Sequence, residues 1–183
     1  MDNPKLLVNC HVFDGRHADV HRDQYILVRD GKIAEVGTWS PAQARTGVAV
    51  VDLRGSYVMA GLFNMHTHFS LALPGPLGDS VRAMSPHELM LYIADGARRT
   101  LLSGVTSVRC VGESDHAEFA LRSAIAAGRA EGPRIFSAGR ALVCTGGHGH
   151  EAPSALECDG PDGFARGVRA QIKACAVTLR PQA

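Results

Sequence analysis

The sequence predicts an α/β protein, with a small antiparallel sheet over residues 1–58 and alternating strands and helices over residues 59–183. In the first part, short apolar segments are separated by Asp-Gly and Gly turns, a pattern typical of strands and hairpins. From about Gly61 onward, short apolar runs alternate with segments whose apolar residues recur every three or four positions. This alternation indicates parallel strands joined by right-handed helical crossovers.

Turn residues mark the N-terminal strands. The segment "KLLVNCHVF" is a short apolar run that ends before the turn Asp14-Gly15. The segment "QYILVRDGKIAEVG" has two alternating arms around Asp30-Gly31, a pair that tolerates positive φ and therefore favours a hairpin. The segment "VAVVDLRGSYVMAG" predicts two further short strands around Gly55.

A strand "LFNMH" opens the second part, and a capped helix follows it. Ser85 can cap the backbone amide of Glu88, the Glu88 side chain can reach back, and Pro86 suits the first helical position. The helix is expected to end near Ser103, with Gly104 just beyond it.

Two more strand–helix units follow. After the strand "VTSVRCV", Asp115 and Glu118 repeat the capping pattern, and Gly128 ends the predicted helix. Its apolar face comprises Ala117, Ala120, Leu121, Ala124 and Ile125. The strand "RIFSAG", a Gly-rich connection over residues 140–160 and an amphipathic helix over residues 162–175 complete the third unit.

Composition narrows the class of protein. The chain has 183 residues, 45% apolar content and a net charge of +1, which indicates a globular protein with no nucleic-acid partner. No apolar run approaches the roughly 20 residues of a membrane helix. The cysteines are odd in number and form no C-x-x-C pair, so we expect reduced, buried thiols in a cytoplasmic protein. They are Cys10, Cys110, Cys144, Cys158 and Cys175.

The stretch "GLFNMHTHFS" contains two candidate metal ligands, His66 and His68. Side chains alternate along a strand, so two histidines separated by one residue share a face. Two imidazoles so placed can bind one Zn²⁺-like ion. The spacing alone equally suits an ordinary solvated strand end.

The longer segment "VVDLRGSYVMAGLFNMHTHFS" resembles the signature of the amidohydrolase superfamily, in which a sandwich strand leads into "PGLID-x-H-x-H" on the first barrel strand. The segments "LLSGVTSVRCVGE" and "EGPRIFSAGRALVCTGGHGH" resemble the second and third strands of the imidazolonepropionase-like branch, which includes Xaa-Pro and Xaa-Arg dipeptidases. The resemblance implies the N-terminal part of a (β/α)8 TIM barrel over residues 59–183, preceded over residues 1–58 by strands of a small composite β-sandwich.

The same resemblance implies that His66 and His68 are the metal pair, with zinc as the expected divalent ion and one or two ions in full-length members. Three positions depart from the pattern. Ala60 replaces the usual Pro, Asn64 replaces an Asp, and Cys110 stands where a similar strand often carries Asp. None of these changes removes a direct metal ligand.

The loop "TGGHGH" is the second candidate site. By resemblance it lies at the mouth of the barrel, with His148 and His150 as substrate-binding residues, although the family often has Asp where His150 stands. The alternative is a surface loop with incidental histidines. Glu113 follows a strand end and is not assigned a role. The remaining histidines are expected on the surface: His11, His17, His21, His87 and His116.

The later catalytic positions of the family have no counterpart here. A full barrel needs about 250 residues, and the family's carboxylated Lys, two single His and final Asp belong to later strands. Lys173 sits on a helix, one element too early to be that Lys. We therefore expect a truncated chain, and the strand face turned away from the helices is expected to expose Leu62, Val105, Val108 and Ile135.

The predicted function is that of a metal-dependent amidohydrolase, which cleaves non-peptide or dipeptide-type C–N bonds of a small molecule with metal-activated water, present here as a part inactive alone. Two alternatives stay open. One is a non-catalytic half-barrel that pairs with a complementary chain or forms an oligomer. The other is a small metal-binding module built from His66, His68, His148 and His150.

Overall fold

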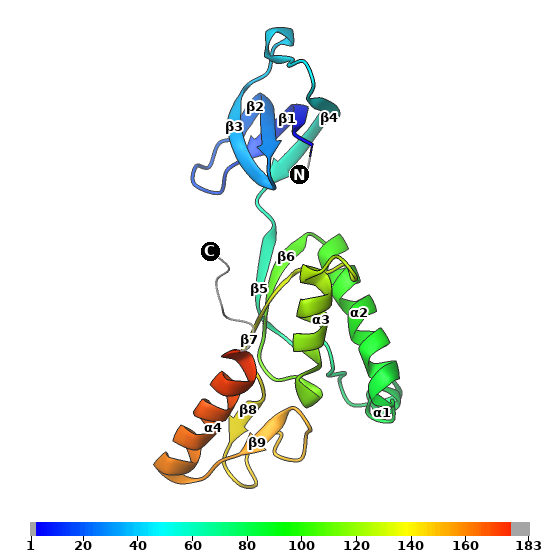
Figure 1. The fold of residues 1–183 in the computed structure, drawn as a ribbon, viewed down its shortest axis with the longest axis vertical. Coiled ribbons are helices and arrows are strands. Elements are labelled where there is room, and N and C mark those ends of the chain that lie inside the picture. Colours follow the sequence, from blue (N-terminus) through cyan, green and yellow to red (C-terminus); the bar gives the residue numbers. More distant parts are fainter. Residues whose placement is uncertain (1–2, 177–183) are drawn as a thin grey trace. The chain divides into compact units, whose positions relative to one another are not determined.

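The computed structural model describes residues 3–176. The chain divides into two compact units, Met1–Ala60 and Gly61–Ala183 (Figure 1). None of the described helices is long and apolar enough to cross a lipid bilayer.

The N-terminal unit is a four-stranded mixed sheet in the order β3-β2-β1-β4. Its strands are β1 (Lys5–Phe13), β2 (His21–Arg29), β3 (Lys32–Thr38) and β4 (Ala49–Met59). Both hairpins, β1–β2 and β2–β3, are antiparallel, but β4 pairs parallel with β1. The prediction of a purely antiparallel sheet is therefore wrong for β4. The segment after β3, which contains the short 3-10 helix η1 (Pro41–Gln43), is a crossover and not a hairpin turn.

The strand β4 is continuous, whereas two strands were predicted. Arg54 and Gly55 both have positive φ, of 53° and 78°. At this point the register with β1 jumps from Val8↔Asp52 to Cys10↔Ser56. The extra residues form a β-bulge. A bulge and a turn can both contain a glycine with positive φ, so the sequence pattern predicted a turn here.

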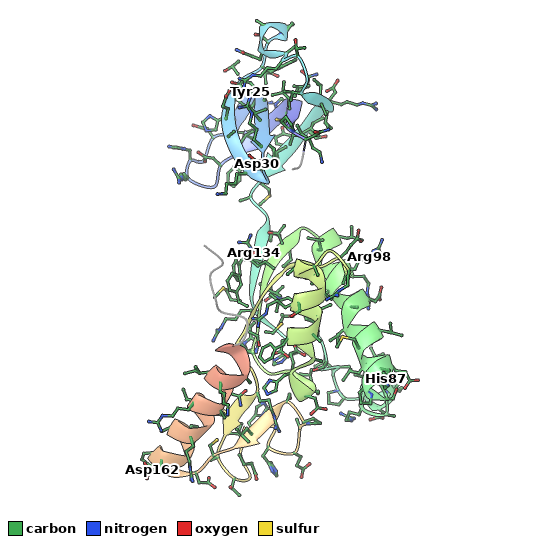
Figure 2. The ribbon with its side chains drawn as sticks, in the orientation of Figure 1. Tyr25, Asp30, His87, Arg98, Arg134 and Asp162 are labelled. Carbon is green, nitrogen blue, oxygen red and sulfur yellow. The ribbon has the colours of Figure 1, made fainter. Side chains whose placement is uncertain are left out.

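A small core holds this sheet. It consists of Leu6, Val8, Tyr25 and Leu27, with Trp39 and Val48 packed beside it. Tyr25, labelled in Figure 2, keeps its hydroxyl at the edge of the core, 3.3 Å from the Glu35 carboxylate to which it donates.

The second unit contains the predicted parallel sheet, in the order β5-β6-β7. The strands are β5 (Leu62–Thr67), β6 (Val105–Cys110) and β7 (Arg134–Ser137). The helices are α1 (Pro76–Arg82), α2 (Pro86–Leu102) and α3 (Ala117–Ala126), of which α1 was not predicted. Gly61 lets β5 approach β6 closely, because a Cβ there would lie 2.1 Å from the Thr106 hydroxyl oxygen.

Helix α2 begins and ends as the sequence predicts. Ser85 accepts a hydrogen bond from the Glu88 amide, and the Glu88 carboxylate accepts one from the Ser85 amide at 2.8 Å. Ser103 is the C-cap, and Gly104 follows with φ of 92°. Helix α3 differs, because no side chain caps it. The short 3-10 helix η2 (Ser114–His116) precedes it, and the predicted capping residue Glu118 is instead fully buried.

Helices α2 and α3 cover one face of the parallel sheet and bury a single apolar cluster. Its buried members are Phe69, Ile93, Ala97, Val108, Cys110, Leu121 and Ile135, and Val105 packs partly against them. The expectation that Val105, Val108 and Ile135 would stay exposed is wrong. Val108 and Cys110 are two residues apart on β6 and both face the helices. Of the four residues named, only Leu62 is half exposed, at 50%.

The opposite face of the sheet carries two aromatic side chains. Phe63 and Phe136 stack with ring centroids 5.6 Å apart, and they are 51% and 46% exposed. This stacked pair is an exposed apolar surface on the face away from the helices, and the sequence analysis did not name it.

The predicted connection over residues 140–160 contains two short parallel strands, β8 (Ala141–Val143) and β9 (Ala155–Glu157). Runs of three residues are too short to show a period in the sequence. Helix α4 (Gly160–Ala176) follows, slightly longer than predicted, and carries Lys173 exposed on the helix as expected.

The cysteines are free thiols where the structure describes them. Cys10, Cys110 and Cys158 are buried as predicted, but Cys144 is exposed, so the expectation is wrong for that residue. It lies next to the end of β8, at the start of the loop that precedes β9. The side chain of Cys175 is outside the described part of the structure.

The central position of Ile93 gives a test of the core. Replacing Ile93, 1% exposed, with Ala removes buried methyl groups and should lower the free energy of unfolding by about 2–5 kcal/mol. Leu91 is on the same helix but 74% exposed, so Leu91→Ala should change the free energy of unfolding by about 0.5 kcal/mol or less. Denaturant unfolding of both variants measures this. Equal losses would show that α2 does not pack as described.

Candidate metal centre

His66 and His68 lie at the C-terminal end of β5, the first strand of the parallel sheet. Their Nε2 atoms are 3.3 Å apart, and their ring centroids are 5.2 Å apart. His66 is exposed, whereas His68 is partly buried. The structure therefore brings the two predicted ligands together with the same ring nitrogen of each facing the other.

A backbone contact sets the tautomer of His68. Its Nδ1 lies 2.8 Å from the carbonyl oxygen of Gly112, which can only accept a hydrogen bond. Nδ1 therefore carries the proton, and Nε2 keeps a lone pair for a ligand. Gly112 is buried and has φ of 130°, a conformation that favours glycine, so this residue holds the carbonyl in place.

The spacing of the two Nε2 atoms fits a metal ion. Zinc–nitrogen bonds of 2.0–2.1 Å in a tetrahedral arrangement place neighbouring ligand atoms about 3.3 Å apart. The observed Nε2–Nε2 separation of 3.3 Å equals that spacing, so this geometry is compatible with both rings as ligands of one ion.

Asn64 supports the backbone and not the imidazole rings. Its Oδ1 accepts a hydrogen bond from the His66 amide at 3.1 Å. An Asp at this position could accept the same bond, so the departure from the family pattern preserves this local contact.

Glu113 is the buried polar residue that fixes the turn after β5. It is 1% exposed, and its two oxygens accept from the Phe69 amide at 2.7 Å, the Ser70 amide at 2.8 Å and the Ser70 hydroxyl at 2.6 Å. The Ser70 hydroxyl oxygen in turn accepts from the Ser114 amide at 3.0 Å. Glu113 therefore connects the loop after β5 to the loop after β6, next to the Gly112 carbonyl that contacts His68.

A second buried acid lies near the same end of the sheet. One Glu118 oxygen accepts from the Ser137 hydroxyl, and the other has no hydrogen-bond partner among the described residues. Burial raises the pKa of Glu118, which favours the protonated form. Burial, together with the neighbouring Glu113 and Glu118, also raises the pKa of the Cys110 thiol, so Cys110 is an inert thiol here.

The loop between β8 and β9 carries His148 and His150. His148 is exposed. The His150 Nδ1 lies 3.2 Å from a Glu157 carboxylate oxygen, and its Nε2 lies 3.8 Å from Glu151. Glu157 also accepts from the Gly146 amide at 3.1 Å, so it contacts both ends of the "GGHGH" segment, Gly146 and His150. His150 is thereby engaged with one carboxylate of its own loop, Glu151, and one at the end of β9, Glu157.

Within residues 3–176, neither His66 nor His68 belongs to a group of three or more potential ligands with mutually close ligand atoms. The structure thus does not gather His66, His68, His148 and His150 into one four-histidine site. It does gather one cluster that sequence reasoning treated as ordinary surface, formed by Asp14, His17 and His21. The available signal was the spacing of these residues across a predicted turn, which brings their side chains to one hairpin loop.

Comparison with known proteins places the whole of the second unit, Gly61–Ala183, in one family. Residues 57–183 match the sequence model of the amidohydrolase family. This range includes all of β5 and both candidate metal ligands, His66 and His68. The match covers more than half of the chain.

Individual relatives and solved structures agree at the family level and differ in activity. The chain is 33% identical over 90 residues to an adenine deaminase of Dehalococcoides mccartyi, covering 49% of this chain and 14% of that protein. It is 33% identical over 91 residues to a 5'-deoxyadenosine deaminase of Methanosarcina mazei, covering 46% of this chain and 20% of that protein. The structure of a Xaa-Pro dipeptidase with bound methionine superimposes with a TM-score of 0.80 and 26% identity, over 93% of this chain and 44% of that one.

The Glu113 contacts predict a measurable role. Glu113→Gln keeps the shape but turns one acceptor oxygen into an NH₂ group that faces N–H or O–H donors, so the free energy of unfolding should fall by about 1–3 kcal/mol. Glu131→Gln is the matched control, because the Glu131 side chain is 73% exposed and forms a surface ion pair with Arg98. Denaturant unfolding compares the two. A Glu113→Gln variant as stable as Glu131→Gln would contradict the proposed clamp.

Proposed function

Because this chain belongs to the amidohydrolase family, we propose that it supplies the His-x-His metal pair of a metal-dependent hydrolase that acts on C–N bonds. The observation that carries the proposal is the pair of Nε2 atoms, 3.3 Å apart at the end of the first parallel strand. The aligned regions cover 14% of the adenine deaminase and 44% of the dipeptidase, so a hydrolytic activity is proposed for this chain and not transferred from those proteins.

The residues present fit a divalent ion, with zinc proposed from the two imidazole donors. When bound, such an ion lowers the pKa of a water molecule and polarises a carbonyl or similar group. His68 is oriented for binding by its Nδ1–H bond to Gly112, which also makes its Nε2 the ligand atom. Glu113 holds the turn that carries His68, so ligand geometry depends on a buried contact.

For the substrate, we favour a dipeptide-type or related small amide. The support is the likeness to the Xaa-Pro dipeptidase structure, with a TM-score of 0.80 over 93% of this chain. Deamination of a nucleobase-like substrate is the second candidate, and the 33% identity to the adenine deaminase favours it. His148 and His150 are proposed substrate contacts. His148 is exposed, whereas Glu151 and Glu157 engage His150.

We further propose that residues 59–183 form the first three βα units of a TIM barrel and that residues 1–58 belong to a small composite sandwich. The three-stranded parallel sheet and the exposed Phe63–Phe136 stack support the barrel, since further strands would enclose that face. An oligomer or a complementary chain is the alternative source of such strands. The free thiols in the described residues favour a reducing compartment, which fits a cytoplasmic location.

Metal titration followed by NMR tests the pair. Zinc should shift the ring nitrogen signals of His66 and His68, with Nε2 of each as the ligand. His68→Ala should weaken zinc binding at this position about tenfold or more, since loss of even an indirect contact commonly costs that much. His87, exposed in the first turn of α2 (Figure 2), serves as the control, and His87→Ala should leave both ring shifts intact. Ring signals that saturating zinc leaves unmoved would refute the metal pair.

Activity assays test the completeness of the site. The purified chain with zinc should show no turnover of Xaa-Pro dipeptides and release no ammonia from adenine, because the described residues provide only two grouped ligands at this position. The measurements are amine or ammonia release over hours. A zinc-dependent rate that His68→Ala abolishes would contradict this expectation and would indicate that a second copy supplies the remaining groups.

A further inference from the structure

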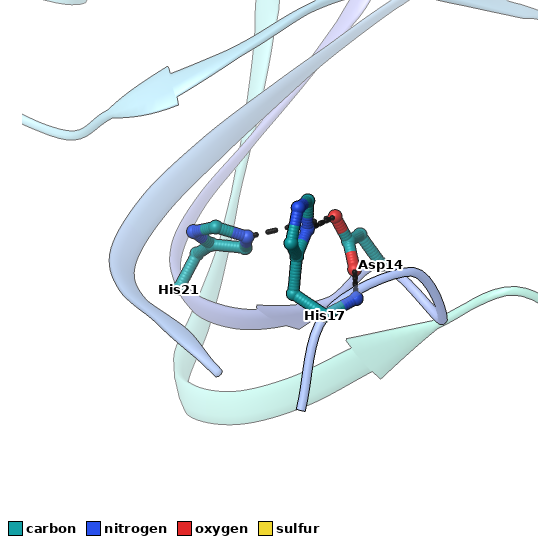
Figure 3. A group of neighbouring side chains, drawn as sticks. All are labelled: Asp14, His17 and His21. Carbon is teal, nitrogen blue, oxygen red and sulfur yellow. Dashed lines mark hydrogen bonds and ion pairs between the residues drawn. The ribbon is translucent and has the colours of Figure 1, made fainter. Parts of the chain in front are cut away.

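A hairpin loop in the N-terminal unit gathers three metal-binding side chains (Figure 3). Asp14 directly follows β1, and His21 is the first residue of β2, so the ends of two paired strands bring them together. The Oδ1 atom of Asp14 accepts from the amides of Arg16 at 2.8 Å and His17 at 3.0 Å. These bonds fix the orientation of the carboxylate and leave its other oxygen available.

Both imidazoles point at that other oxygen. The His17 Nδ1 lies 2.8 Å from Asp14 Oδ2, and the His21 Nε2 lies 3.6 Å from the same atom. The two rings are nearly perpendicular, at 86°, with centroids 6.0 Å apart. All three ligand atoms lie within 4.8 Å of one another (Figure 3).

A surface ion pair accounts for only part of this geometry. A protonated His17 would explain the 2.8 Å contact, but the 3.6 Å separation of His21 from the same oxygen is longer than a normal hydrogen bond. Around a tetrahedral zinc ion, ligand atoms lie about 3.3 Å apart. The two observed separations fall on either side of that value, so small side-chain movements would place all three atoms around one ion.

The surroundings permit those movements. The side chains of His17 and His21 are 67% and 49% exposed, and that of Asp14 is 28% exposed, so no core packing opposes them. The same exposure leaves the remaining coordination position open to water. His11, the other histidine of this region, is engaged elsewhere, because its Nδ1 accepts from the Asp23 amide at 3.3 Å and its ring contacts Tyr57.

We propose that Asp14 Oδ2, His17 Nδ1 and His21 Nε2 bind one divalent transition-metal ion, zinc in the first instance, that clips β1 to β2. Two nitrogen donors and one carboxylate suit zinc, nickel or copper, whereas calcium and magnesium prefer oxygen ligands alone. The ion joins the two ends of the hairpin loop, so its binding stabilises the folded N-terminal sheet. This site is separate from the His66–His68 pair and does not depend on it.

Zinc calorimetry on the full chain tests the site. A His66→Ala, His68→Ala background removes the other candidate ligands, so a negative result here says nothing about the function proposed above. In that background we expect one saturable zinc equivalent and a higher thermal midpoint with zinc. Adding His17→Ala and His21→Ala should abolish both effects. Adding His87→Ala instead, as the matched exposed control, should leave both unchanged.

A second readout needs no variant. Cobalt added to the unmodified chain should broaden the amide NMR signals of Arg16, His17 and His21 at low metal ratios, and excess zinc should restore them. His21→Gln, which keeps a polar side chain but loses the imidazole, covers the case in which the multiple variant fails to fold, and it should remove the broadening. No saturable zinc in the background variant, an equivalent that survives loss of both hairpin histidines, or cobalt broadening confined to other residues would each overturn the proposal.

Discussion

The buried carboxylate of Glu113 is the contact on which the candidate metal centre depends. Burying a carboxyl group without hydrogen-bond partners is costly, and three donors from the turn after β5 satisfy that of Glu113, which is 1% exposed. The turn is therefore fixed relative to β6, since Glu113 follows that strand closely. The neighbouring Gly112 carbonyl then orients His68. The position of the His68 ring thus depends on the buried hydrogen bonds of Glu113 as well as on the strand β5.

The two histidine sites of this chain are built in different ways. At the end of β5, the ring of His68 is partly buried and its tautomer is set by a backbone carbonyl. In the hairpin, Asp14 is held by backbone amides while both imidazoles remain largely exposed. The first arrangement is prepared to hold an ion in one geometry. The second brings ligands close but leaves the ion to order them, and this suits a structural clip better than a catalytic centre.

Membership of the amidohydrolase family constrains the chemistry but not the substrate. Deaminases and a dipeptidase both resemble this chain, and both classes break C–N bonds. Loops such as the one that holds His148 generally vary more than the elements they connect, so family membership alone does not fix the substrate.

Sequence patterns were sufficient to predict the elements with strong local signals: the capping box at Ser85, the glycine after α2, the parallel β5-β6-β7 order and the family to which the chain belongs. Four other features depend on how the folded chain packs. They are the parallel pairing of β4, the packing of Val108 against the helices, the burial of Glu118 and the cluster of Asp14, His17 and His21. Capping and turn chemistry act between residues a few positions apart, so a pattern can reveal them. Strand partners, the covered face of a sheet and the satisfaction of a buried acid depend on residues far apart in the chain, and only packing brings those together.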